Sequence, residues 1–184
     1  MLETIQAIDA AALLAIQNIR VEFLNPVVEV FTSMGNLGLL FIVLSLLMLF
    51  GKKTRKAGFF ALLAMAFGLL CTNVTLKHLV ARPRPWLDVP GLIHLVEEND
   101  PNSFPSGHTC AAFSACMVWA EVLKERWQKW AAVILAFCMG LSRLYVGVHY
   151  PTDVLVGAVV GCLCAGVSLT LMRYYDKKSA LKHS

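Results

Sequence analysis

The sequence predicts an all-α membrane protein: one polytopic membrane helix bundle with five to six transmembrane helices and an N-terminal amphipathic helix. Apolar residues make up 58% of the 184-residue chain, which is more than the roughly half found in soluble domains. These residues also come in blocks long enough to cross a hydrocarbon core, which takes about 20 helical residues. We therefore expect a single membrane domain over residues 1–184.

Residues 4–20 are predicted to form the amphipathic helix. Ile5, Ile8, Leu13 and Ile16 recur at helical spacing, with polar residues on the opposite face. Acidic residues within the segment and an arginine at its end favour a helix lying in the membrane interface rather than a span. A sixth span at this position stays open as the alternative.

Five apolar segments that follow a short element after Pro26 are long enough, or nearly so, to span a bilayer. The predicted spans are residues 36–50, 57–79, 107–123, 130–147 and 153–172. Their loops differ in charge, because 51–56 and 124–129 are basic whereas 80–105 is rich in acidic residues. The positive-inside rule then places the basic loops and the C-terminus in the cytoplasm, and residues 80–105 and 148–152 on the outer face of the cell membrane.

Small residues recur every four positions in three of the predicted spans, a pattern that lets helices pack closely in lipid. The stripes are Gly107/Ala111/Ala115, Ala132/Ala136/Gly140 and Gly157/Gly161/Ala165. We expect them to pack the last three spans against one another. A homodimer face along the last stripe is the competing interpretation, so a homo-oligomer stays open.

Polar residues gather where the predicted spans reach the outer face. The first group follows the second span, where Pro83 and Pro85 favour an extended segment that carries Arg84 back over the membrane surface toward Lys77. Snorkelling of basic side chains at a helix end would explain this group equally well.

The second group, residues 104–108, opens the third span. A proline, Ser106 at the cap position and Gly107 beside it leave backbone N–H groups free at a positive helix end, which favours anion binding. His108 would lie at the rim of this site. An ordinary capped helix would explain the serine but gives no reason for the histidine.

The third group, residues 142–153, lies between the last two spans. Arg143 and His149 are six residues apart, roughly 240° around an ideal helix, so they can face one ligand only if the helix ends near Gly147. A proline starts the next helix and places Asp153 in its first turn, close enough to hydrogen-bond His149 and fix its tautomer. A buried Arg–Asp pair that only stabilises the bundle is the competing interpretation.

Together these groups place two histidines, one carboxylate, three cations and a helix N-terminus on one membrane face. Fixed cations and backbone donors suit a dianionic phosphoryl group, with one histidine attacking phosphorus and the other protonating the leaving oxygen. The residues alone do not decide which histidine attacks. No cluster of carboxylates or His/Cys ligands predicts a metal site, so we expect no metal and no cofactor. The net charge of +4 comes from short clusters and does not predict nucleic-acid binding.

Three motifs resemble the signature of the type 2 phosphatidic acid phosphatase superfamily: Lys77-x6-Arg84-Pro85, Pro105-Ser106-Gly107-His108 and Ser142-Arg143-x5-His149-x3-Asp153. The resemblance implies an all-helical core and a phosphohistidine intermediate on His149, which Asp153 would orient, with His108 as the acid for the leaving group. It also implies five phosphate-binding residues: Lys77, Arg84, Ser106, Gly107 and Arg143.

The function expected from this resemblance is hydrolysis of a membrane lipid phosphate or diphosphate, with undecaprenyl diphosphate as the leading substrate. Phosphatidylglycerophosphate and phosphatidate are alternatives, and a phosphotransferase that uses a lipid or sugar acceptor is another. A haloperoxidase is less favoured, because the haloperoxidases of this superfamily are soluble. A catalytically silent membrane transporter or scaffold would belong to a different class, and the intact histidines argue against it.

The predicted orientation can be tested with a cysteine at Asn99, in the acidic loop. We expect Asn99→Cys to react with a membrane-impermeant thiol reagent added outside intact cells, whereas Lys53→Cys in a basic loop should react only after permeabilisation. Labelling of the Asn99 variant from the cytoplasmic side alone would show that the orientation is inverted.

Overall fold

The computed structural model describes residues 2–182, so residues 1, 183 and 184 of the predicted domain lie outside the described part. The fold is all-α, as predicted, and the described residues contain no strand beyond one isolated bridge between Pro83 and Asn102. The helices are α1 Leu2–Asn18, α2 Asn25–Met34, α3 Leu39–Leu49, α4 Arg55–Leu69, α5 Lys77–Val80, α6 Pro85–Asp88, α7 Gly107–Val122, α8 Arg126–Tyr145 and α9 Pro151–Lys182.

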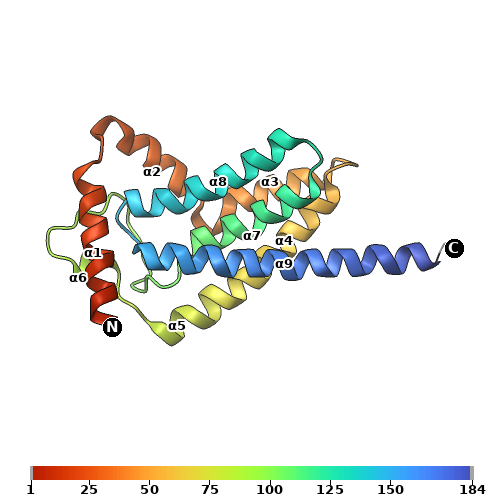
Figure 1. The fold of residues 1–184 in the computed structure, drawn as a ribbon. Coiled ribbons are helices and arrows are strands. Elements are labelled where there is room, and N and C mark those ends of the chain that lie inside the picture. The colour runs from red at the N-terminus through yellow and green to blue at the C-terminus, as the bar shows by residue number, and fades with distance from the viewer. Residues whose placement is uncertain (1, 183–184) are drawn as a thin grey trace.

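Helix α7 is the centre of the bundle and packs against α4, α8 and α9 (Figure 1). Its sequence has no polar face, and most of its side chains are buried. The main core lies around it, with Phe41 of α3, Phe60 of α4 and Trp119 of α7 among its largest members. A π-helical turn over Leu70–Leu76 joins α4 to α5 without breaking the helix.

Helix length and hydropathy identify a membrane protein. Two continuous helical stretches, Arg55–Val80 and Pro151–Leu181, are long and apolar enough to cross a membrane. The segments Glu22–Met34 and Asn36–Leu49 qualify as a third when taken together, although a 52° bend separates them. Helix α7 has 16 residues and is about 24 Å long, which is short for a span. The count of five to six transmembrane helices stays a prediction.

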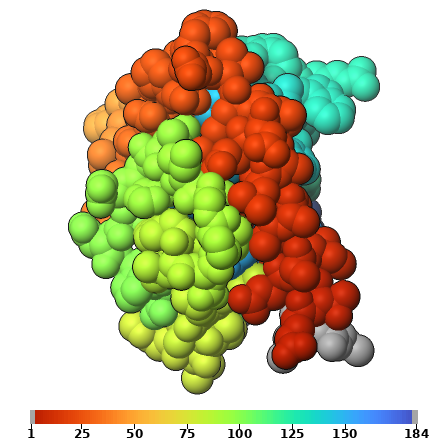
Figure 2. Space-filling view, turned by 90° about the vertical axis from the view of Figure 1, so that its left-hand side faces the viewer, coloured from red at the N-terminus to blue at the C-terminus, as the bar shows by residue number. Residues whose placement is uncertain are grey.

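Helix α1 lies across one end of the bundle, next to the segment that joins α5 to α7 (Figures 1 and 2). Gln17 bonds to the carbonyl of Gly91 and to the N–H of Ile93 at 3.0 and 2.7 Å, which ties α1 to this segment. Its inner face carries Asp9 and Leu13, both buried. An interfacial position of α1 in the membrane stays a prediction.

The small-residue stripe of α9 packs against α7 within the chain, as predicted. A Cβ atom added at Gly157 would lie 2.6 Å from the carbonyl oxygen of Ser106, and one at Gly161 would lie 2.7 Å from that of Cys110. The two backbones therefore approach as closely as glycine allows. This contact uses the surface that a homodimer through Gly157 and Gly161 would need.

Leucine at Gly161 should destabilise the bundle. We expect Gly161→Leu to lower the free energy of unfolding by about 1–3 kcal/mol or more, the usual cost of overpacking a tight interface. Gly166 of the same helix is the matched control, because a Cβ there meets nothing within 4 Å. Thermal unfolding in detergent should show a lower melting temperature for Gly161→Leu than for the wild type, and an unchanged one for Gly166→Leu. Equal melting temperatures of the two variants would contradict this packing.

Candidate active site

The first group of predicted site residues lies at the end of the α4–α5 helix. This helix ends at Val80 because Ala81 takes a left-handed conformation, with φ of 46°. The chain then runs extended through Arg84, as the two prolines predict. Lys77 is mostly buried, and its Nζ lies 2.7 Å from the Asp100 carboxylate.

Arg84 is 1% exposed and lies against the loop between α8 and α9. Its Nη1 donates to the carbonyl of Val148 at 3.0 Å and lies 3.1 Å from Nε2 of His149. Its Nε donates to the carbonyl of Asp100 at 2.9 Å. The structure thus brings Arg84 directly to His149, although 65 residues separate them.

The prediction that the fourth span ends near Gly147 is confirmed. Helix α8 ends at Tyr145, and Gly147 has a φ of +78°, in the left-handed region that favours glycine. The chain turns there, so that His149 leaves the helical path and meets Arg84. His149 is 1% exposed.

Asp153 lies beside His149 in the first turn of α9. Its Oδ2 is 3.6 Å from Nδ1 of His149, within ion-pair range but longer than a hydrogen bond. The same oxygen accepts from the N–H of Tyr150 at 2.8 Å, and Oδ1 accepts from Arg82 at 2.9 Å. Nδ1 of His149 has no hydrogen-bond partner among the described residues.

Arg82 is a residue of this site that the motifs did not identify. Its guanidinium donates to Asp153 and, through Nη2, to Asp9 of α1 at 2.8 Å. It also lies over the ring of Tyr150, 3.7 Å from the centroid, in a cation–π contact. Asp9 in turn accepts a short hydrogen bond from the hydroxyl of Thr152. The carboxylate beside His149 is therefore fixed by residues from α1 and from the segment after α5.

Glu98 is not part of the three sequence motifs, yet it forms ion pairs with two of the predicted phosphate-binding residues. Its Oε2 accepts from Arg84 Nη2 at 3.3 Å, and its Oε1 makes a short ion pair with Arg143. Arg143 is 1% exposed and also donates to the hydroxyl of Thr32 at 2.7 Å. One carboxylate thus bridges the two guanidinium groups.

The second predicted group forms the start of α7. Ser106 is the N-cap, and its Oγ accepts from the N–H of Thr109 at 3.4 Å. Its own N–H is used, since it donates to the carbonyl of Asp153 at 3.0 Å. His108 follows, with Nε2 3.0 Å from Oδ1 of Asn36. Ser106 is fully buried behind the site.

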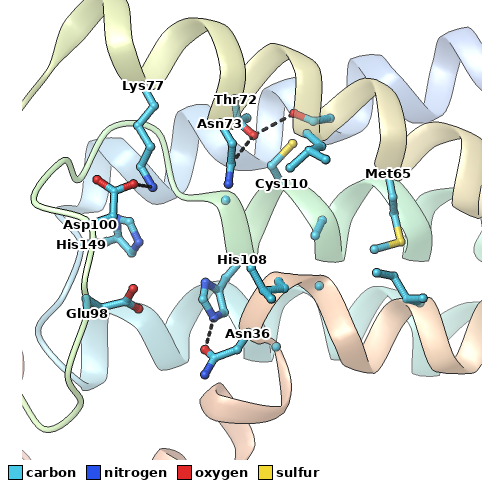
Figure 3. A pocket seen from close by; sticks show the side chains of 18 of the residues that line it. Asn36, Met65, Thr72, Asn73, Lys77, Glu98, Asp100, His108, Cys110 and His149 are labelled. Atoms are coloured by element: carbon cyan, nitrogen blue, oxygen red, sulfur yellow. Dashed lines mark hydrogen bonds and ion pairs between the residues drawn. The ribbon is translucent and has the colours of Figure 1, made fainter.

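These residues surround one cavity of about 770 Å³. Figure 3 shows Lys77, His149 and His108 turned toward it, with the Glu98 and Asp100 side chains on the same side. Gly107 also lines it, whereas Ser106, Arg143 and Asp153 lie in the layer behind. The other end of the cavity is apolar and is formed by α3, α4 and α7 through Ile42, Leu62, Met65, Ala66, Leu69 and Ala111.

The electrostatics of this end keep His149 neutral. Burial lowers the pKa of His149 well below its usual value, and the positive charges of Arg84, Arg143 and Lys77 lower it further. A neutral imidazole keeps a lone pair available for nucleophilic attack. Among residues 2–182, no three or more His, Cys, Asp or Glu side chains are grouped to hold a metal ion.

A comparison with protein families assigns the chain. The family model described as the PAP2 superfamily matches residues 57–177, a range that contains Lys77, His108, His149 and the other predicted site residues. The chain belongs to the PAP2 superfamily. The helices α1 to α3, with Asp9, Thr32 and Asn36, lie outside the matched range.

Several relatives of the chain carry the names of lipid phosphatases. Phosphatidylglycerophosphatase B of Bacillus subtilis is 32% identical over 95% of this chain and 86% of its own length. The undecaprenyl-diphosphatase of Sulfolobus acidocaldarius is 30% identical over 70% of this chain, and the match covers 61% of that relative's length. The crystal structure of Aquifex aeolicus LpxE superposes with a TM-score of 0.76 at 28% identity, covering 86% of this chain and 92% of that one.

Removal of the Glu98 charge should strengthen anion binding in this PAP2 site. We expect Glu98→Gln to lower the dissociation constant of inorganic phosphate roughly three- to tenfold. A tenfold change corresponds to about 1.4 kcal/mol of binding free energy. The reason is that a carboxylate no longer competes for Arg84 and Arg143. Glu22→Gln is the matched control, since Glu22 is exposed and does not line the cavity. Calorimetric titration should separate the two variants, and weaker binding to Glu98→Gln than to the wild type would contradict this expectation.

Proposed function

We propose that this protein is a metal-independent membrane lipid phosphatase that acts through a phosphohistidine on His149. One observation carries the proposal: a single cavity has two histidines and cationic groups at one end and an apolar wall at the other. The polar end suits a phosphate group, and the apolar end suits the lipid chain attached to it. The names of the PAP2 relatives support the same reaction class.

The cations that form ion pairs with Glu98 and Asp100 are the proposed phosphate-binding groups. In this proposal the substrate phosphate displaces these two carboxylates and takes their places beside Arg84, Arg143 and Lys77. Three cations around a dianion neutralise the charge that a metal ion neutralises in other phosphatases. Gly107 brings the backbone of the α7 N-terminus to the cavity wall, and Ser106 caps that terminus from behind.

The proposed reaction has two steps. In the first, Nε2 of His149 forms a bond to phosphorus while the bond to the leaving oxygen breaks, and His108 gives that oxygen its proton. The leaving oxygen is the bridging oxygen of a lipid diphosphate or the alcohol oxygen of a lipid monophosphate. In the second, water attacks phosphorus, His108 takes a proton from the water, and phosphate leaves as the bond to His149 breaks. Asp153 balances the charge that His149 acquires, from its position 3.6 Å from Nδ1.

Undecaprenyl diphosphate is the substrate that we propose first, with undecaprenyl phosphate and phosphate as products. Several relatives of the chain are named for polyprenyl substrates, which supports this choice. Phosphatidylglycerophosphate is the second candidate, because the relative matched over 95% of this chain is named for it. Phosphatidate and a lipid phosphotransferase reaction stay as alternatives.

The proposed place of the reaction is the outer face of the cell membrane. The basic loops lie at the end of the bundle opposite the cavity, and the basic C-terminal turns of α9 extend beyond that same end (Figure 1). The positive-inside rule then assigns the cavity to the side away from the cytoplasm.

Phosphate release from purified protein in EDTA tests the proposed function. We expect turnover of undecaprenyl diphosphate, phosphatidylglycerophosphate or phosphatidate in detergent, with His149→Ala lowering kcat by roughly 10³-fold or more, as loss of a nucleophile does elsewhere. His78→Ala is the matched control, because His78 is an exposed histidine on the neighbouring helix. Wild-type turnover by His149→Ala would exclude the phosphohistidine, and loss of turnover in EDTA would exclude the metal-independent reaction.

A further inference from the structure

The segment between α2 and α3 reaches into the cavity and contacts His108. Nε2 of His108 lies 3.0 Å from Oδ1 of Asn36, and Figure 3 draws this contact between the two labelled side chains. A carboxamide oxygen only accepts hydrogen bonds, so the proton in this contact belongs to Nε2 of His108. The contact therefore fixes the orientation of the imidazole ring and identifies Nε2 as a protonated nitrogen.

The backbone next to Asn36 has a strained conformation at the point where Asn36 contacts His108. Leu37 and Gly38, the two residues after Asn36, both have left-handed conformations with φ of 53° and 73°. For leucine this conformation is uncommon and costs on the order of 1–3 kcal/mol. The Leu37 side chain is 96% exposed, so its own packing does not offset that cost.

Gly35, on the other side of Asn36, also approaches the histidine. A Cβ atom at Gly35 would lie 2.9 Å from Cδ2 of His108 and 2.8 Å from Sδ of Met139. The turn is therefore packed directly on the edge of the imidazole ring. Strain and close approach occur together at the point where the bent pair of helices meets His108, at the 52° bend.

We propose that Asn36 is a positioning residue for the leaving-group acid, His108. By accepting from Nε2–H, Asn36 leaves Nδ1 as the nitrogen that carries the transferable proton in the imidazolium form of His108, the doubly protonated form that acts as the acid. In Figure 3 the Nδ1 edge of the ring is turned toward the side of the cavity that holds His149. During cleavage the Nδ1 proton passes to the leaving-group oxygen as the P–O bond breaks, while the Nε2–H bond to Asn36 stays in place. Asn36 itself does not touch the reacting atoms.

This inference rests on the proposed function, because it assigns a residue to the acid step of that reaction. Four charged or titratable side chains from other elements lie around His108: Arg143, His149, Arg84 and Lys77. None of them is an acceptor for Nε2, whereas Asn36 is. Asn36 lies outside the range matched by the PAP2 family model, so the segment between α2 and α3 supplies it to the site from the rest of this chain.

The experiment compares two substrates that differ in their need for an acid. Alkoxide leaving groups need a proton during P–O cleavage, whereas p-nitrophenolate leaves without one. We expect Asn36→Leu to lower kcat on a short-chain alkyl phosphate by about 10- to 100-fold, the range that misplacement of a catalytic group costs. On p-nitrophenyl phosphate the same variant should lose less than about threefold, because general-acid assistance is small there.

Two further variants make the test specific. Asn36→Asp keeps an acceptor oxygen and should restore the alkyl phosphate rate to within about threefold of the wild type. Asn18→Leu makes the same kind of change at an exposed asparagine of α1 and should leave the ratio of the two rates unaltered. A merely structural role for Asn36 would lower both rates equally, and the rate on p-nitrophenyl phosphate also reports that the variant is folded.

The outcomes separate this inference from the proposed function. If the wild type releases phosphate from both substrates in EDTA but Asn36→Leu leaves the ratio of the two rates unchanged, the positioning role of Asn36 is wrong and the phosphatase stands. If the wild type releases phosphate from neither substrate nor from the lipid panel, the proposed function itself fails. A selective loss on the alkyl substrate, with rescue by Asn36→Asp, would support both.

Discussion

Positive charge buried at one end of an apolar bundle is the constraint on which the rest of this structure depends. Arg84 and Arg143 are each 1% exposed, and an unpaired ion in a protein interior costs several kcal/mol even after relaxation. Four of the cations at this end are met by carboxylates, in the pairs Arg84–Glu98, Arg143–Glu98, Lys77–Asp100, Arg82–Asp9 and Arg82–Asp153. Neutralising the cations thus also joins α1, the 81–106 segment, α8 and α9.

The carboxylates fall into two kinds, and the difference has a functional meaning. Asp9 and Asp153 lie on helices, and their side chains are 2% and 0% exposed, so they are fixed partners of Arg82. Glu98 and Asp100 lie on the loop before α7, and their side chains are 17% and 43% exposed. A phosphate dianion can replace a loop carboxylate at little cost to the fold, because the cations stay neutralised. In the proposed reaction, the substrate phosphate takes the places of these two loop carboxylates.

Local signals in the sequence account for most of the fold and for the three motifs. Glycine and proline at 107, 147 and 151 mark helix ends that the structure places where expected, because backbone conformation at these residues is decided locally. The partners of the motif residues, by contrast, could not be predicted from local signals in the sequence. Glu98 meets Arg143 across 45 residues, and Asn36 meets His108 across 72. Neither residue differs by type or spacing from an ordinary loop residue, so only the folded chain identifies it.

Irregular backbone gathers at the same end of the bundle as the buried cations. The positive φ angles of Leu37, Ala81 and Gly147 and the π-helical turn at 70–76 all adjoin residues of the cavity. Non-helical backbone at membrane depth is tolerated only where protein or a water-filled cavity satisfies its polar groups. A continuous helix would direct Arg84 and His149 along their helix axes and apart from each other. The breaks turn these side chains into one cavity, and the hydrogen bonds and ion pairs formed there offset the cost of breaking the helices.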